Sequence, residues 1–150
     1  MIKTENLCKS FGDIKAVNNV SLTITDNSIF GLAGTNGAGK STLLRMLSGV
    51  LKQDSGKIAV DGSEVYENPQ KKSDIFFLPD TAYFFQNSTM LDMAKYFAIY
   101  YPRYDVGRLE KLADNLGLEK KRKISTFSKG MKRQASMLLG ICAGTKYLFC

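Results

Sequence analysis

The sequence GTNGAGKSTLL, residues 34–44, combines three glycines with a single lysine and a Ser-Thr pair. It follows a continuous apolar run at 29–33 and precedes a helical pattern of leucines at 43, 44 and 47. A continuous apolar run is typical of a strand buried on both faces of a parallel sheet. We therefore expect a buried strand over 29–33, then a glycine-rich turn, then a helix.

This stretch matches the phosphate-binding pattern G-x-x-x-x-G-K-[ST] through Gly34, Gly39, Lys40 and Ser41. Glycines let the backbone bring several N–H groups toward one point, and the following helix adds the positive end of its dipole. We expect Lys40 to bridge the β- and γ-phosphates of a nucleotide and the Ser41 hydroxyl to ligate Mg²⁺. A glycine turn that only begins an ordinary helix would leave the Lys-Ser pair unexplained.

Length and composition place the chain among globular proteins. Its 150 residues suffice for one domain or part of one, with 44% hydrophobic and 23% charged residues. No apolar run approaches the roughly 18 residues of a membrane-spanning helix, and the start, MIKTENLCKSFG, lacks the apolar centre of a secretory signal. We therefore expect a cytosolic location.

Two residue types limit the chemistry. Histidine is absent, which excludes a histidine base and the commonest zinc ligand. The scattered cysteines, Cys8, Cys142 and Cys150, are expected to be reduced and mostly buried. Chemistry here must use lysine, hydroxyl groups, carboxylates, backbone amides or a hard metal ion.

The net charge of +7 is compatible with an anionic partner such as a nucleotide, a nucleic acid or lipid headgroups. The densest basic run, at 120–123, follows a helical pattern. We interpret it as a solvated helix end that the helix dipole favours.

Along the rest of the chain the pattern of apolar residues changes from strand-like runs to helical periodicity. Alternating or short apolar runs predict strands at 2–8, 17–25, 58–60, 75–78 and 147–150, with a turn at 61–62. Capping patterns predict three helices. The first, 90–100, opens with a capping-box pattern of Thr89 and Asp92. The second follows Asp105, carries Leu109, Leu112 and Leu116 on one face, and closes at Gly117. The third, 129–142, follows Ser128.

The segment FSKGM, residues 127–131, by itself predicts only a capped helix start. Its place in the chain is more informative. Phe11, the phosphate-binding loop, a strand ending in Leu78-Pro79, a helical insert, FSKGM and a last apolar strand follow one another over nearly the whole sequence. In this order they resemble the ATP-binding subunits of ABC transporters, in particular the bacterial exporter-type branch.

The resemblance implies an α/β P-loop NTPase fold of the ABC ATPase type, with an antiparallel β subdomain, a mainly parallel core sheet and an α-helical subdomain. It implies a single, truncated ATPase domain over 1–150. Within it, we expect a β-rich part with the loop at 1–86, a helical insert at 87–128 and a return to the core sheet at 129–150.

The resemblance also implies residues of an ATP site. The Phe11 ring would stack on adenine with Val17 as an apolar wall, although plain core packing is an equal alternative for Phe11. FSKGM matches the family signature, in which Ser128 and Gly130 would grip the γ-phosphate of ATP on a second subunit in a head-to-tail dimer. The loop's own nucleotide-binding residues would be Asn36, Gly37, Ala38, Gly39, Lys40, Ser41 and Thr42.

Three departures from the family pattern bear on activity. Asp80 stands where the family usually has a glutamine, and its carboxylate could reach Mg²⁺ directly or through water, so we expect Lys40 and Asp80 to be catalytic and Ser41 and Asp80 to bind the metal. Lys129 and Met131 replace a glycine and a glutamine of the signature.

The third departure is that the sequence ends at Cys150 before the two acids of the Walker B motif. We therefore expect an N-terminal fragment with an unpaired central strand. Without the carboxylates that support Mg²⁺ and orient water, it should bind ATP weakly and hydrolyse it negligibly.

The implied function is the coupling of ATP binding and hydrolysis to transport through partner membrane subunits, at the inner face of the cell membrane and without nucleic acid. The alternatives are a soluble ABC-type ATPase that acts on ribosomes or nucleic acid, a small-molecule kinase and a nucleotide-binding regulatory protein. The single phosphate-binding loop disfavours the first, and the FSKGM segment disfavours the second. Asp80 and the missing acids keep the third open.

Overall fold

The computed structural model describes residues 1–150, which divide into two compact units, residues 1–72 and residues 73–150. The first holds an antiparallel sheet and the glycine-rich loop. The second holds a parallel strand pair and three longer helices. These elements confirm the α/β fold class expected from the sequence.

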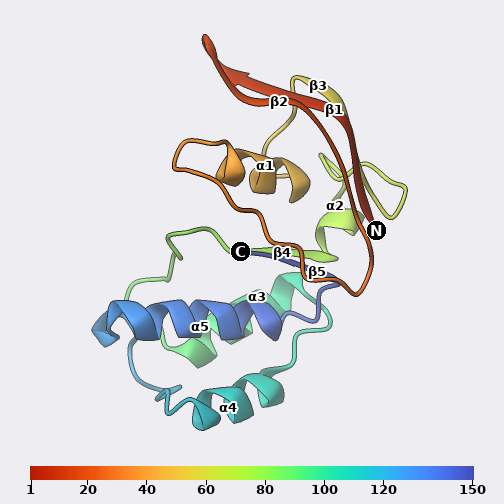
Figure 1. The fold of residues 1–150 in the computed structure, drawn as a ribbon. Coiled ribbons are helices and arrows are strands. Elements are labelled where there is room, and N and C mark those ends of the chain that lie inside the picture. The colour runs from red at the N-terminus through yellow and green to blue at the C-terminus, as the bar shows by residue number, and fades with distance from the viewer. The chain divides into compact units, whose positions relative to one another are not determined.

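The sheet of the first unit consists of β1 (Ile2–Phe11), β2 (Ile14–Ile24) and β3 (Ser55–Val60). All pairs are antiparallel in the order β2-β1-β3, as Figure 1 shows. The strands predicted at 2–8, 17–25 and 58–60 are confirmed with shifted ends. Asp61 and Gly62 have φ of 50° and 79°, which confirms a turn directly after β3.

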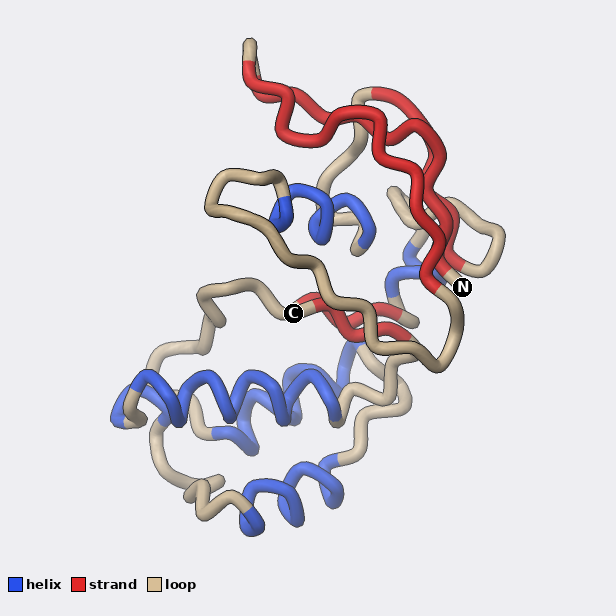
Figure 2. Tube along the Cα trace, viewed as in Figure 1, coloured by secondary structure: helices blue, strands red, loops and turns tan.

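The helix predicted after the glycine-rich loop is α1 (Lys40–Leu47), whose buried residues are Leu43, Met46 and Leu47. The strand predicted at 29–33 is wrong. This segment has no strand partner, the Ile29 side chain is fully exposed, and Figure 2 shows loop from the end of β2 to α1. An apolar run forms a strand only where a neighbouring backbone completes its hydrogen bonds, and the run itself does not specify that neighbour.

One short helix of the first unit was not predicted. It is α2 (Pro69–Lys72), which is a single turn. Proline suits the first helical position, and the Asn68 side chain accepts a hydrogen bond from the Lys71 N–H at 3.2 Å. A single turn is too short to produce a periodic signal in the sequence.

The second unit contains β4 (Ile75–Phe77) and β5 (Tyr147–Phe149), which pair in parallel. Both were predicted as apolar strands. The helices of this unit are α3 (Met90–Tyr100), α4 (Val106–Asn115) and α5 (Lys129–Ile141), and a 3₁₀ turn, η1 (Ile124–Thr126), precedes α5.

Each of these three helices begins where its capping residue predicts. The Thr89 hydroxyl accepts from the Asp92 N–H at 3.2 Å, and the Asp92 carboxylate accepts from the Thr89 N–H at 2.9 Å, which forms a capping box. The backbone and hydroxyl of Thr89 lower the pKa of Asp92. The Asp105 carboxylate accepts from the Arg108 N–H at 2.8 Å and starts α4.

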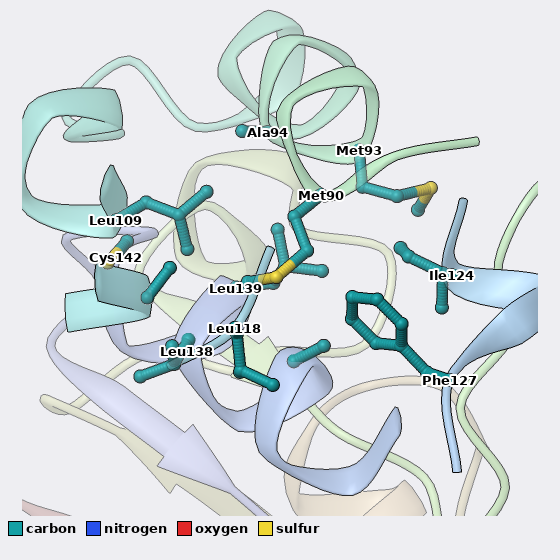
Figure 3. Packing of buried hydrophobic residues seen from close by; sticks show 12 residues of the cluster. Met90, Met93, Ala94, Leu109, Leu118, Ile124, Phe127, Leu138, Leu139 and Cys142 are labelled. Atoms are coloured by element: carbon teal, nitrogen blue, oxygen red, sulfur yellow. The ribbon is translucent and has the colours of Figure 1, made fainter. Parts of the chain in front are cut away.

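A single apolar cluster joins the three helices, and Figure 3 shows its side chains directed toward one another. Met90 and Met93 come from α3, Leu109 from α4, and Leu139 from α5. Phe127, only 4% exposed, adds its ring just before α5 begins. The residue before the capping Ser128 is therefore anchored in the core.

Helix α5 packs closely on the β4 and β5 strands. A Cβ placed on Gly140 would lie 3.1 Å from side-chain carbons of both Phe76 and Leu148. The absence of a side chain at this position therefore allows the close approach of helix and sheet.

Three smaller expectations differ from the structure. Leu116 is 49% exposed because α4 ends at Asn115, so it lies beyond the predicted apolar face. Of the three cysteines only Cys142 is buried, whereas Cys8 is partly exposed and Cys150 is exposed. The run 120–123 lies in a turn rather than at a helix end.

The basic run is held by local ion pairs. The Lys120 ammonium lies 2.7 Å from the Asp114 carboxylate near the end of α4, and the Arg122 guanidinium lies 3.2 Å from that of Glu119. Two of its charges are thus partly neutralised by neighbours on the same surface.

Two tyrosines of the second unit differ in how their hydroxyl groups are satisfied. The Tyr101 hydroxyl donates to the Ile75 carbonyl oxygen at 3.3 Å. The Tyr104 hydroxyl is buried without a hydrogen-bond partner. Its burial strongly raises the pKa of Tyr104, and the nearby Cys142 thiol adds to the effect.

Replacing each tyrosine with phenylalanine should therefore affect the free energy of unfolding differently. Tyr104→Phe removes a buried, unpaired hydroxyl and should leave stability unchanged or raise it by about 1 kcal/mol. Tyr101→Phe loses a hydrogen bond and should cost about 0.5–1.5 kcal/mol. Urea unfolding of the chain, followed by far-ultraviolet circular dichroism, measures both. A larger loss for Tyr104→Phe than for Tyr101→Phe would contradict this description.

Candidate functional site

The glycine-rich loop of the first unit is an exposed turn fixed at one end by a backbone contact. Gly37 and Gly39 both have φ of 84°, a left-handed conformation that favours glycine. A Cβ on Gly39 would overlap the carbonyl oxygen of Ala16 on β2 and come within 3.6 Å of the Val17 side chain. The loop therefore reaches the start of α1 at a point where only glycine fits against β2.

Helix α1 differs from the other long helices in how it begins. Its N-cap residue is Gly39, and no side chain caps the helix. By contrast, α3, α4 and α5 begin with side-chain caps from Thr89, Asp105 and Ser128. Because the N–H groups of a first helical turn have no acceptor within the helix, the start of α1 is available to an external anion.

The Lys40 side chain adds a full positive charge to this turn. Its ammonium donates to the carbonyl oxygens of Gly34 and Thr35, each at 2.7 Å. The side chain therefore folds back across the loop instead of extending into solvent. Cationic nitrogen and helix N–H groups are thus supplied by one short segment.

The structure places the other predicted loop residues around this turn. Asn36, Gly37 and Ala38 are exposed, and the Ala38 N–H donates to the Thr35 carbonyl at 3.2 Å. Ser41 is exposed on the first turn of α1, and Thr42 is partly buried beside it. The predicted phosphate-binding residues therefore lie together on one surface of the first unit.

The predicted adenine residues lie on the first two strands. Phe11 ends β1 and is 51% exposed, so core packing does not account for it. Val17 is buried on β2, next to the position that a Gly39 side chain would occupy. One hairpin thus carries the exposed Phe11 ring on β1 and, on β2, the residues against which the loop packs.

The predicted signature residues lie in the second unit at the start of α5. The Ser128 hydroxyl oxygen accepts from the Met131 N–H at 3.2 Å, which caps the helix. Ser128, Lys129 and Gly130 are exposed, and a Cβ on Gly130 would approach nothing closer than the Ser128 hydroxyl at 4.0 Å. The first turn of α5 therefore presents an open surface of small side chains beside one lysine.

Asp80, the other predicted site residue of the second unit, is exposed three residues after β4. It lines a cavity of about 380 Å³ together with Lys129, Lys132 and Arg133. The Arg133 guanidinium contacts the Pro79 carbonyl at 3.5 Å. No role for Lys132 and Arg133 is predicted from the sequence, although both follow FSKGM directly and lie on the same helix.

The predicted magnesium ligands are of suitable chemistry but few. Ser41 offers a hydroxyl and Asp80 a carboxylate, which are hard oxygen ligands. The structure contains no group of three or more acidic, histidine or cysteine side chains that could enclose a metal ion. Magnesium in phosphate sites is usually held by one or two protein ligands, with phosphate and water oxygens completing the shell. Each of these two side chains, one in each unit, has the chemistry for that mode.

An aromatic surface was missed by the sequence analysis. Exposed rings of Tyr83, Phe85, Tyr96 and Tyr100 lie close together in the second unit, and the Phe85 and Tyr96 centroids are 4.7 Å apart. Three of these rings line an apolar cavity of about 310 Å³. The sequence indicates this surface through the aromatic run Tyr83-Phe84-Phe85, in which two of the three rings are exposed.

None of the helices has the length and apolar character required to cross a bilayer.

Comparison with known proteins assigns the chain to a family. The family described as ABC transporter matches residues 17–150, and the chain belongs to this family. The chain is 33% identical over 143 residues to the ABC transporter ATP-binding protein YtrB of Bacillus subtilis (strain 168). The matched region covers 95% of this chain and 49% of YtrB. The chain thus spans about half the length of that relative.

Solved structures show the same fold. An ATP-binding subunit of an ABC transporter superposes with a TM-score of 0.86 at 22% identity, over 99% of this chain and 65% of the other. The dimeric structure of MJ0796, a bacterial ABC transporter cassette, gives 0.84 at 20% identity, over 99% and 72%. The ABC ATPase type of P-loop fold expected from the sequence is confirmed. These matches give no support to the ribosome- or nucleic-acid-directed alternative.

The cap at Ser128 leads to a test of how the signature helix is held. Ser128→Ala removes the acceptor for the Met131 N–H and should lower the free energy of unfolding by about 0.5–2 kcal/mol. Ser128→Asp keeps a capping oxygen and adds a charge that the helix dipole favours, so it should lose little or nothing. Urea unfolding of the chain measures both variants. Equal losses for alanine and aspartate would show that the hydroxyl does not act as a cap.

Proposed function

We propose that this chain is the ATP-binding part of an ABC transporter, in which ATP binding and hydrolysis drive transport through partner membrane subunits. The observation that carries the proposal is the start of α1, where a glycine N-cap leaves the helix without a side-chain cap and Lys40 folds across the loop. A triphosphate supplies the negative oxygens that this arrangement lacks.

Each predicted residue then has a defined role. The N–H groups of the first turn of α1 and the Lys40 ammonium bind the phosphates, and the exposed Phe11 ring stacks on adenine. Ser41 and Asp80 supply oxygen ligands for Mg²⁺, which would neutralise charge on the phosphates when bound. The proposed catalytic residues are Lys40 of the first unit and Asp80 of the second unit.

Dimer formation is the second part of the proposal. Ser128 and Gly130 present an open helix N-terminus, which is suited to contact the γ-phosphate of an ATP held by a second subunit. The dimeric structure of the neighbour MJ0796 supports dimer formation as such. Lys129, where the family signature has glycine, adds a positive charge next to that phosphate.

Hydrolysis requires more than phosphate binding. It also needs a carboxylate that orients an attacking water, and the one carboxylate among the predicted site residues, Asp80, is assigned to the metal. We therefore propose that these residues bind ATP but hydrolyse it negligibly as an isolated chain. Magnesium-dependent hydrolysis by this chain, abolished in Lys40→Ala, would contradict that statement.

The membrane partner is proposed to contact the exposed aromatic surface of the second unit. A cluster of exposed rings around an apolar cavity is typical of a protein interaction surface. Such a contact would hold the protein at the inner face of the cell membrane. Co-purification of the whole protein with membrane subunits would support it, and co-purification with ribosomes instead would contradict it.

Calorimetric titration of the chain with Mg-ATP tests nucleotide binding. Lys40→Ala removes a charged hydrogen-bond donor to phosphate and should weaken ATP binding by about 10- to 100-fold. Lys57→Ala is a matched control, because it removes the same charge from β3 and should leave the affinity within about twofold.

The proposal fails if the unaltered chain does not bind Mg-ATP. It also fails if Lys40→Ala binds ATP as tightly as Lys57→Ala, because phosphate would then be attracted only by the general positive charge of the chain.

A further inference from the structure

The end of β1 is held by a residue to which the sequence analysis gave no role. The pairing of β1 with β3 ends at Cys8 and Ser55, so β1 has no strand neighbour on that side beyond Cys8. Asp54 replaces the missing strand. Its N–H donates to the Cys8 carbonyl at 3.0 Å, and its carboxylate accepts from the Ser10 N–H at 2.7 Å.

The same carboxylate also fixes Lys9. The Lys9 ammonium lies 2.5 Å from the second carboxylate oxygen of Asp54, and the Lys9 side chain is only 15% exposed. Lys9 and then the Ser10 N–H hold the pKa of Asp54 below its ordinary value. The ion pair thus joins the hairpin to the residue before β3, through a largely buried lysine and a carboxylate side chain that is 46% exposed.

Lys9 in turn contacts the proposed adenine-stacking ring. Its ammonium lies over the Phe11 ring, 5.7 Å from the centroid, within the range of a cation–π interaction. One face of the ring is thus covered by Lys9, which leaves the other face for a base.

Hydrophobic burial does not hold this ring in place. Phe11 is 51% exposed, and Ile14, its partner across the hairpin, is 72% exposed. The strand register also shifts between Lys9 and Ser10, so the regular ladder is interrupted just before Phe11. Polar contacts from outside the hairpin are therefore needed to fix the direction of the ring.

We propose that Asp54 is a positioning residue for base recognition, which holds Phe11 for stacking through its bonds to Lys9 and to the Ser10 N–H. This inference rests on the proposed function, because it assigns a geometric cause to the adenine contact. A ring that is already fixed loses less conformational entropy when a base stacks on it, so Asp54 increases the share of affinity that the base contributes.

The test compares the affinity of the chain for ATP with its affinity for inorganic triphosphate, which has no base. Asp54→Ala should lower the ATP affinity about tenfold, as Phe11→Ala should, and leave the triphosphate affinity within about twofold. The double variant Phe11→Ala/Asp54→Ala should lose no more than Phe11→Ala alone. Lys9→Met keeps the Ser10 bond and should lower only the ATP affinity, by about two- to fivefold.

Asp13→Ala is the matched control. Asp13 lies at the tip of the same hairpin and carries the same charge, but the bonds to Lys9 and Ser10 come from Asp54. This variant should leave the ratio of the two affinities unchanged. It thereby accounts for any general effect of removing a negative charge from the chain.

The remaining outcomes separate the inference from the proposed function. The inference is overturned if the ratio of ATP affinity to triphosphate affinity is the same in Asp54→Ala as in Asp13→Ala. It is also overturned if Asp54→Ala loses ATP and triphosphate binding in parallel, because that result indicates a purely structural role. Absence of triphosphate binding by the unaltered chain would overturn the proposed function and the inference with it.

Discussion

The contact between Gly39 and the carbonyl of Ala16 is the constraint on which the site of the first unit depends. At φ of 84°, and with no space for a Cβ against β2, this position accepts only glycine without a shift of the backbone. The same residue is the N-cap of α1 and therefore leaves that helix without a capping side chain. One steric requirement thus fixes the place of α1 beside the sheet and also leaves its N-terminus available to phosphate.

In the second unit, by contrast, a side chain caps the start of α5. The Ser128 hydroxyl satisfies one N–H of the first turn, that of Met131, and the preceding residue, Phe127, is anchored in the apolar cluster. At the far end of the same helix, Gly140 allows close packing on β4 and β5. A helix held at both ends keeps its exposed first turn in a defined position.

The features that the sequence predicted well are those with short-range causes. The capping box of Thr89 with Asp92 and the cap at Asp105 involve residues three apart, so their helices were located from the sequence. The apolar run at 29–33 predicted a buried strand incorrectly, because its pairing depends on a neighbour that the run does not specify. The role of Asp54 could not be read from the sequence either, since Ser10 lies 44 residues away in the chain.

The central claim is that backbone N–H groups at the start of α1 bind phosphate directly. The most direct measurement is a titration of the ¹⁵N-labelled chain with inorganic triphosphate, followed by amide nuclear magnetic resonance. The claim predicts that the largest shift changes occur at Gly39, Lys40 and Thr42, whose amides surround the start of α1. Changes confined to the basic run at 120–123, with the amides of α1 unaffected, would contradict it.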